Sequence, residues 1–241
     1  MNENYEQQYN LSLFINIIRD FLKSQQFFEH HLYSTLNYKI ENTDSFEVKE
    51  NLYLRYNPEP DIWQVGIHHD KFFWIGSMFR NEKKVSDFHR YEFTVVDIYE
   101  SQGSAESVIK RYIQILKKLE GQLKLPNVSD LEVRYMTHEE FAKTKDKLEG
   151  KYWLVVTGYP INESFYDTKG KDSGHTSKFE IFFINQGKSI EIAACGKLGE
   201  NLNKDNYISE KENFINTELL KKNFIGFGIG IERLMYLYGI K

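Results

Sequence analysis

Apolar residues recur at helical spacing in three parts of the chain. In residues 11–28 and again in residues 104–123, apolar side chains stand three and four positions apart. The third part, residues 137–148, begins with a capping box, because Glu140 follows Thr137 by three positions. Each of these parts is predicted to form a helix with one apolar face.

Short runs rich in aromatic and β-branched residues predict strands elsewhere. They cover residues 72–79, 91–99, 154–157, 179–184 and 189–194. The first two runs are joined by a charged stretch without apolar period, which predicts a long antiparallel hairpin. This mixture of elements predicts an α+β fold, in which a mostly antiparallel sheet of six or seven strands is flanked by helices.

Three glycines at alternate positions near the C-terminus predict a bare strand. Gly226, Gly228 and Gly230 precede a helical apolar pattern that contains Arg233. Glycine at every second position leaves one face of a strand open to a flat ligand or to another backbone. The fork of an arginine just after such a strand can bind a phosphate. The pattern fits a nucleotide site, and it also fits a buried strand followed by a core helix.

The predicted hairpin collects polar and aromatic residues at one end. Arg80 and Glu82 follow its first strand, and His89 and Phe93 lie where the second begins. Arg80 can neutralise an α-phosphate, and Phe93 can stack on a purine ring. Glu82 can accept from an exocyclic amine, and His89 can reach outer phosphates. A surface hairpin with ordinary salt bridges is the alternative interpretation.

Composition limits the class of protein. A chain of 241 residues with 41% hydrophobic residues is expected to form one domain over residues 1–241. Its single cysteine, Cys195, excludes a disulfide framework and a cysteine-rich zinc site. The polar N-terminus lacks a signal-peptide core, and no apolar run is long enough to span a membrane. With a net charge of −4 and no basic tail, a cytoplasmic protein without membrane or DNA partners is expected.

The stretches FRNE, HRYEFT and GFGIGIERL resemble the second and third motifs of class II aminoacyl-tRNA synthetases, in the family's order. The similarity is greatest to the aspartyl, asparaginyl and lysyl subclass. Its further segments are YLRYNPE at residues 53–59, YPINESFYD at residues 159–167 and FEIFFINQGKSIEIAACG at residues 179–196. The resemblance covers nearly the whole chain and implies a class II synthetase-like catalytic core.

This resemblance implies a reaction and a set of roles. In the family, ATP binds on the sheet and an amino-acid carboxylate attacks its α-phosphorus, giving an aminoacyl-adenylate and pyrophosphate. Arg80 would hold the α-phosphate and the attacking carboxylate, while Phe93 and Arg233 would enclose the adenine. Glu82 would read the adenine amine, and His89 would steady the outer phosphates. Gly228 and Gly230 would belong to the ATP-binding floor.

The resemblance also implies Mg²⁺ as a cofactor. Glu191 matches the position of a metal-binding glutamate, so it would coordinate Mg²⁺ bridging phosphate oxygens. Glu180 is a candidate for a second metal ligand. Its separation from Glu191 in the sequence is longer than in family members.

The amino-acid pocket departs from the family pattern. Glu59 matches a contact to the α-ammonium group in lysyl relatives. Ile62 and Leu198 stand where aspartyl relatives have a lysine and an arginine, and lysyl relatives have a glutamate at the second position. Burying a substrate carboxylate without these cations would cost several kcal/mol, which argues against aspartate. Tyr166 either lines this pocket or belongs to the core.

The expected function is ATP-dependent activation of an amino acid. The acyl group would pass to a non-translational acceptor such as ammonia, a metabolite, a carrier or a protein, because the chain shows no anticodon-binding domain. Asparagine synthesis is the known precedent in the family. The helix at residues 11–28 resembles the first motif, which implies a homodimer, although the usual proline is missing from residues 30–35. Two alternatives stay open: a tRNA ligase acting on an acceptor stem, and a non-catalytic regulatory subunit.

Overall fold

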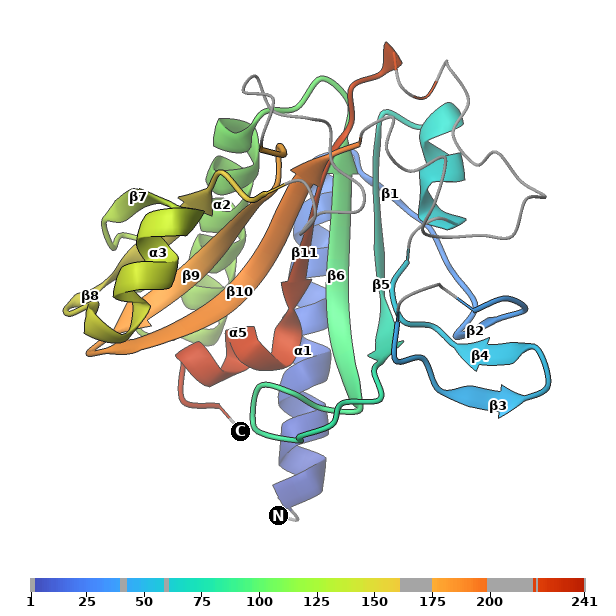
Figure 1. Cartoon of the computed structure of the whole chain (residues 1–241), viewed down its shortest axis with the longest axis horizontal. Helices are drawn as coiled ribbons and strands as arrows, with labels where there is room; N and C mark the ends of the chain where they lie inside the picture. Colours follow the sequence, from blue (N-terminus) through green and yellow to red (C-terminus); the bar gives the residue numbers. More distant parts are fainter. Residues whose placement is uncertain are drawn as a thin grey trace.

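A computed structural model describes residues 3–39, 43–58, 61–160, 175–198, 219 and 221–240. Its main sheet has eight strands in the order β1-β5-β6-β11-β10-β9-β8-β7 (Figure 1). The pairs β1–β5 and β7–β8 are parallel, and all other neighbours are antiparallel. The strands are β1 (Phe28–Glu29), β5 (Lys71–Phe79), β6 (Glu92–Glu100), β7 (Val133–Thr137), β8 (Lys151–Thr157), β9 (Phe179–Asn185), β10 (Lys188–Lys197) and β11 (Ile225–Gly230).

The expected count of six or seven strands is wrong, because the main sheet has eight. The two strands that the sequence pattern did not predict are β1 and β7, at the two edges. β1 has only two residues, and β7 is largely solvent-exposed. A strand that pairs on one side and is half solvated carries little apolar alternation. The mostly antiparallel α+β class with flanking helices is as predicted.

The remaining elements surround this sheet. A second, three-stranded sheet has the order β2-β4-β3. Its strands are β2 (Thr35–Leu36), β3 (Glu47–Lys49) and β4 (Leu52–Leu54). The helices are α1 (Glu3–Ser24), α2 (Ala105–Leu123), α3 (His138–Thr144) and α5 (Ile231–Leu237), with 3₁₀ turns η1 (Asp61–Ile67) and η2 (Lys145–Lys147). None of the helices in the described part is long and apolar enough to cross a lipid bilayer.

All three predicted helices form, with shifted ends. The first ends at Ser24 rather than at residue 28, because Gln26 adopts a left-handed backbone with φ of 65°. The second begins after Ser104, whose hydroxyl accepts from the backbone of Ser107. The third begins after Thr137 with the predicted capping box to Glu140, and it gives way to η2 at Lys145.

The two faces of the main sheet have different roles. α1, α2 and α5 pack on one face over the largest core cluster, and α1 and α2 lie behind the sheet in Figure 1. Because strand side chains alternate, the even-numbered residues of β6, such as Val96 and Ile98, enter this core. Its odd-numbered residues, such as Phe93 and Asp97, point to the opposite face. We call that opposite face the site face.

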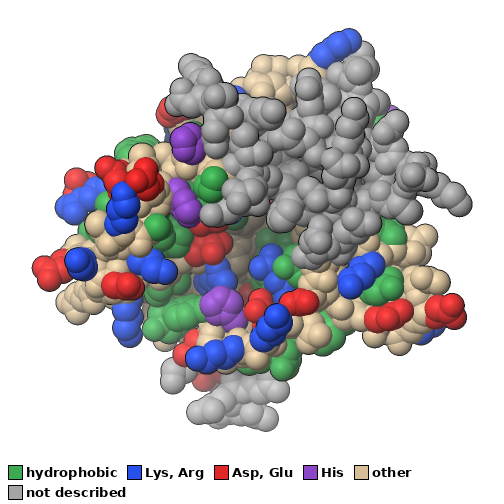
Figure 2. Space-filling model, viewed as in Figure 1, with side chains coloured by type: hydrophobic (Ala, Val, Ile, Leu, Met, Phe, Trp, Pro, Cys, Tyr) green, Lys and Arg blue, Asp and Glu red, His purple; other side chains and the backbone are tan. Residues whose placement is uncertain are grey.

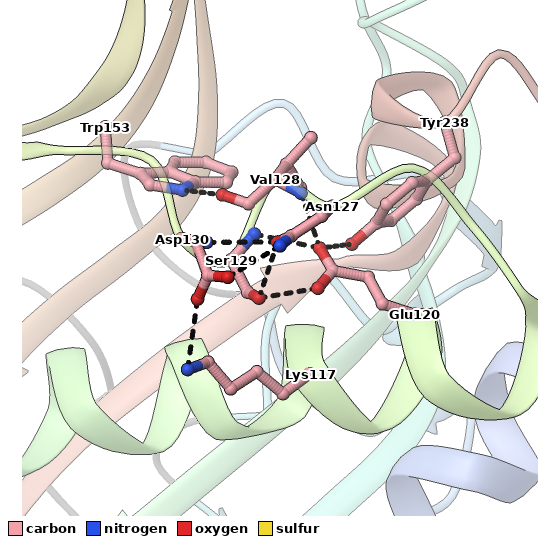
Figure 3. A network of polar contacts seen from close by, with 8 residues as sticks. All are labelled: Lys117, Glu120, Asn127, Val128, Ser129, Asp130, Trp153 and Tyr238. Atoms are coloured by element: carbon pink, nitrogen blue, oxygen red, sulfur yellow. Dashed lines mark hydrogen bonds and ion pairs between the residues drawn. The ribbon is translucent and has the colours of Figure 1, made fainter.

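A polar network ties the C-terminus to α2 (Figure 3). The carboxylate of Glu120 accepts from the backbone N–H groups of Val128 and Ser129 at 2.7 and 2.8 Å, and from the Ser129 hydroxyl. It also accepts from the hydroxyl of Tyr238 at 3.2 Å. Since Tyr238 directly follows α5, this network helps to hold the helix that carries Arg233.

Candidate active site

Four neighbouring strands bring a bare patch to the centre of the site face. In register across the sheet, Asp97 of β6 lies opposite Gly228 of β11. Gly228 lies opposite Ala194 of β10, which lies opposite Glu180 of β9. We call Gly228 and Ala194 the floor, because no large side chain rises from either. The floor therefore lies between two carboxylates that are distant in sequence.

Only one of the two predicted floor glycines is required by space. A Cβ atom at Gly228 would lie 3.3 Å from Oδ2 of Asp97, a contact closer than ordinary van der Waals distance. A Cβ atom at Gly230 would meet nothing nearer than the Arg233 side chain at 3.8 Å. Gly228 thus keeps the floor bare and leaves room for Asp97.

Asp97 is a candidate site residue that the sequence pattern did not single out. Its side chain is buried, and this burial raises its pKa to about 7, against the opposing effect of a hydrogen bond with Tyr99. The sequence does carry a signal for Asp97, because it is a charged residue inside an apolar strand, four positions after Phe93. Even spacing on a strand puts both side chains on one face.

Arg80 lies between two aromatic rings. Its guanidinium carbon is 4.9 Å from the ring centroid of Tyr56 and 5.1 Å from that of Phe93. The backbone N–H of Arg80 donates to the carbonyl of Tyr91 at 2.9 Å, which closes the hairpin. Its side-chain Nε is buried and has no hydrogen-bond partner among the described residues. Arg80 therefore offers an anion a desolvated, uncommitted donor.

Arg233 lies in the first turn of α5 and contacts two other segments. Its Nη2 donates to the carbonyl of Phe88 at 3.0 Å, and its Nη1 donates to the carbonyl of Glu191 at 3.1 Å. Nη1 also lies 3.6 Å from Oε2 of Glu191. The cation over the Phe93 ring is Arg80. The enclosure of adenine by Phe93 and Arg233 stays a prediction for the ATP complex.

Glu232 fixes the helix that carries Arg233. Both of its carboxylate oxygens accept from the backbone N–H of Thr94, at 2.9 and 3.0 Å. Burial raises the pKa of Glu232, while hydrogen bonds from the backbone and the charge of Arg90 act in the opposite direction. No sequence pattern singled out Glu232, although it is the direct neighbour of Arg233.

The connection between β5 and β6 folds back against α5. The ring of Phe88 meets the ring of Tyr236 edge to face, with centroids 4.8 Å apart. The exposed ring of His89 has its Nδ1 3.1 Å from the hydroxyl of Ser86. Glu82 is half-buried, and its backbone N–H donates to the carbonyl of Arg80 at 2.9 Å. Arg80, Glu82 and His89 thus belong to one end of the hairpin, as predicted.

The carboxylate of Glu191 lies among several charges. Its side chain is 39% exposed, and its main side-chain partner is the guanidinium of Arg233. Burial of the carboxylate raises its pKa, and the like charge of Glu180 adds to this effect. The cations Arg233, Arg80 and Lys178 act in the opposite direction. The two predicted metal ligands are therefore close enough to interact.

We tested whether these residues fit Mg²⁺. No group of three or more His, Cys, Asp or Glu side chains in the described part is arranged to hold a metal ion alone. Mg²⁺ in nucleotide sites is commonly held by one or two carboxylates together with substrate phosphates. A partly exposed carboxylate with a single long contact to a cation meets this requirement, so Glu191 fits. Each oxygen of Glu180 already contacts a neighbouring side chain.

The structure describes two of the four residues predicted for the amino-acid pocket. Ile62 and Leu198 are both buried, and they pack in one apolar cluster with Trp74 and Tyr99 of the site face. The structure thus brings together two side chains that are far apart in sequence. Glu59 and Tyr166 lie outside the described residues.

The site face is hollowed in the space-filling view. Figure 2 shows acidic and basic side chains next to one another in this hollow, near the centre of the view. Among the described residues, positive charge around Glu191 comes from Arg80, Arg233 and Lys178. This arrangement is suited to a ligand that carries several negative charges.

Comparison with known proteins identifies the family. The family model of class II tRNA synthetases (D, K and N) matches residues 2–240. The crystal structure of asparaginyl-tRNA synthetase from Pyrococcus horikoshii with asparaginyl-adenylate is similar over 100% of this chain and 67% of that chain. Its TM-score is 0.75 and its sequence identity is 12%, so this similarity concerns the fold. No curated protein sequence gives a significant match. This chain therefore belongs to the class II tRNA synthetases (D, K and N).

Proposed function

We propose that this chain activates an amino acid with ATP, forming an aminoacyl-adenylate and releasing pyrophosphate. The observation that carries the proposal is Arg80, which lies between Tyr56 and Phe93 and whose buried Nε has no hydrogen-bond partner in the described part of the chain. A buried donor without a partner costs free energy, which a bound anion would recover. Membership in the family supports ATP and an amino acid as substrates.

The arrangement supports catalysis by positioning and by charge stabilisation. In the proposed reaction the guanidinium of Arg80 faces the α-phosphate while the amino-acid carboxylate attacks. Donors already in place for the charge of the transition state lower the barrier without further reorganisation. Arg233 would exchange the Phe88 carbonyl for the nucleotide and enclose its adenine with Phe93.

Two residues at the hairpin end complete the nucleotide contacts in this proposal. Glu82 accepts from the adenine amine, and His89 contacts the outer phosphates. Glu191 would hold Mg²⁺, which supplies positive charge to the phosphate oxygens when it is bound. The partly exposed Glu191 carboxylate beside Arg233 supports this role.

For the substrate we propose an amino acid with an uncharged side chain. Ile62 and Leu198 present apolar groups where aspartyl relatives have cations, and both are buried in one cluster. Glu59 and Tyr166 complete the proposed pocket.

The acyl acceptor is proposed to be a small molecule or protein rather than tRNA. The net charge of −4 supports this weakly, since polyanions are attracted by basic surfaces. An assay of AMP release with ammonium ions, and separately with total tRNA, distinguishes the two classes of acceptor. A homodimer in the cytoplasm is part of the proposal, and sedimentation analysis tests its oligomeric state.

The test of activation is amino-acid-dependent exchange of pyrophosphate into ATP. The purified protein is assayed with Mg²⁺ and each of the common amino acids, without RNA. We expect exchange with one amino acid and at least a ~100-fold loss in Arg80→Ala, as for removal of one transition-state donor. Arg134→Ala is the matched control, because Arg134 is exposed on β7, away from the site. Full exchange in a correctly folded Arg80→Ala variant would overturn the assignment.

A further inference from the structure

Glu180 belongs to a closed group of three side chains. Its Oε1 lies 2.9 Å from the ammonium of Lys178, and its Oε2 accepts from the hydroxyl of Tyr159 at 2.5 Å. The same ammonium lies 4.4 Å from the ring centroid of Tyr159. Each member thus contacts the other two. Lys178 and Glu180 expose only 23% and 13% of their side chains, so solvent screens their pairing little.

The carboxylates of Glu180 and Glu191 differ in what they can bind. A metal ion needs an oxygen lone pair that is not already facing a cation. Each oxygen of Glu180 already accepts from one neighbour, and the Lys178 ammonium at 2.9 Å would repel a divalent ion there. The carboxylate of Glu191 has a guanidinium at 3.6 Å and stays 39% exposed. The geometry therefore favours a metal ion at Glu191 and disfavours one at Glu180.

Lys178 reaches the site through strand alternation. It stands two positions before Glu180, so both side chains lie on the same face of the chain leading into β9. Glu180 lies opposite Ala194 of the floor. Tyr159 follows the end of β8, which pairs with β9. The Lys178 ammonium is thus held near the floor by the Glu180 carboxylate and the Tyr159 ring.

We propose that the ammonium of Lys178 takes the place of a second divalent ion at Glu180, so that the chain binds a single divalent ion at Glu191. Lys178 and Tyr159 then act as positioning residues that hold Glu180 away from metal coordination. This inference rests on the proposed function, because it concerns the ion that accompanies ATP. It assigns to this chain a metal requirement of one ion per bound nucleotide.

The test counts bound metal ions directly. Mn²⁺ is titrated into the protein with one equivalent of adenosine 5′-(β,γ-methylene)triphosphate, and free Mn²⁺ is measured by its electron paramagnetic resonance signal. We expect one bound ion per chain in the wild type and in Lys178→Arg. In Lys178→Met, which frees an oxygen of Glu180, we expect two. The double variant Lys178→Met/Glu180→Gln should return to one.

A comparison of the variants Glu180→Gln and Glu191→Gln distinguishes the loss of a metal ligand from a folding defect. With Lys178 intact, Glu180→Gln should change the Mn²⁺ dissociation constant by less than about twofold, and Glu191→Gln should weaken it at least about tenfold, as for loss of a ligand. If the wild type binds two ions and Glu180→Gln binds one, this inference is wrong and the proposed function is unaffected. A single ion in folded Lys178→Met would do the same. Failure of the wild type to bind the nucleotide analogue would instead overturn the proposed function.

Discussion

The backbone N–H of Thr94 donates to both carboxylate oxygens of Glu232, at 2.9 and 3.0 Å. This contact joins the first turn of α5 to the strand that carries Phe93. It therefore sets the position of Arg233 relative to the aromatic ring with which it would enclose adenine. The two neighbouring residues therefore have different roles. The Glu232 carboxylate fixes the position of α5, and the Arg233 guanidinium is proposed to contact the ligand.

Glu232→Ala is expected to weaken both stability and nucleotide binding. The variant leaves the N–H of Thr94 without its acceptor, which costs about 1–3 kcal/mol of unfolding free energy. Loss of helix position should raise the dissociation constant for an ATP analogue roughly tenfold, equivalent to ~1.4 kcal/mol. Urea unfolding and calorimetry measure the two effects. Glu139→Ala, on the exposed side of α3, is the control and should leave nucleotide binding unchanged.

Asp97 predicts a pH dependence of stability. Burial raises its pKa from the ordinary 3.8 to about 7, so the folded protein keeps a proton that the unfolded chain has already released. Stability therefore falls as the pH rises through this window, by ~1.4 kcal/mol for each unit of the pKa shift at most. Asp97→Asn, which has no such proton, should lose less stability between pH 5 and pH 7.5.

Urea unfolding of both proteins at these two pH values measures the difference. Asp20→Asn is the control, because Asp20 is exposed on α1. It should follow the wild type. An identical pH dependence in the wild type and Asp97→Asn would contradict the assignment of the buried proton to Asp97.

A methyl group on the floor should interfere with ligand binding. Gly228→Ala places a Cβ atom 3.3 Å from Oδ2 of Asp97 and stands where a flat ligand would lie. We expect a loss of about 1 kcal/mol of stability from crowding and at least a tenfold loss of nucleotide affinity. Gly121→Ala is the matched control, since nothing lies within 4 Å of its added Cβ on α2. That variant should gain about 0.5–1 kcal/mol. Equal nucleotide affinity in both variants would show that the nucleotide does not lie against Gly228.

The network of Figure 3 predicts coupled stability effects. Tyr238→Phe removes one hydrogen bond to Glu120 and should cost about 1 kcal/mol. Glu120→Ala leaves the backbone N–H groups of Val128 and Ser129 without their acceptor and should cost about 3 kcal/mol or more. Because the two residues share a contact, the double variant should cost less than the sum, by about the value of the hydrogen bond. Additive losses in urea unfolding would show that the Tyr238 contact contributes nothing.

Local patterns predicted the elements that have a buried face. The aromatic and β-branched runs of β5 and β6, the capping box at Thr137 and the glycine strand before Arg233 all depend on neighbours within a few positions. The same local stretches carried the family motifs, so Arg80, Phe93 and Arg233 could be named together. The end of α1 and the edge strands β1 and β7 could not be located, because a short or half-solvated segment has little apolar pattern.

The amino-acid sequence by itself determined the class of fold, the family and the hairpin end with its cation and aromatic ring. Tertiary structure alone decided the register that sets Asp97 opposite Gly228, and Glu180 opposite Ala194. It also decided that Lys178 and Tyr159 close on Glu180, and that Glu232 rather than a local contact holds α5. The physical reason is that strand register depends on pairing between segments far apart in the chain, which no local pattern of side chains records.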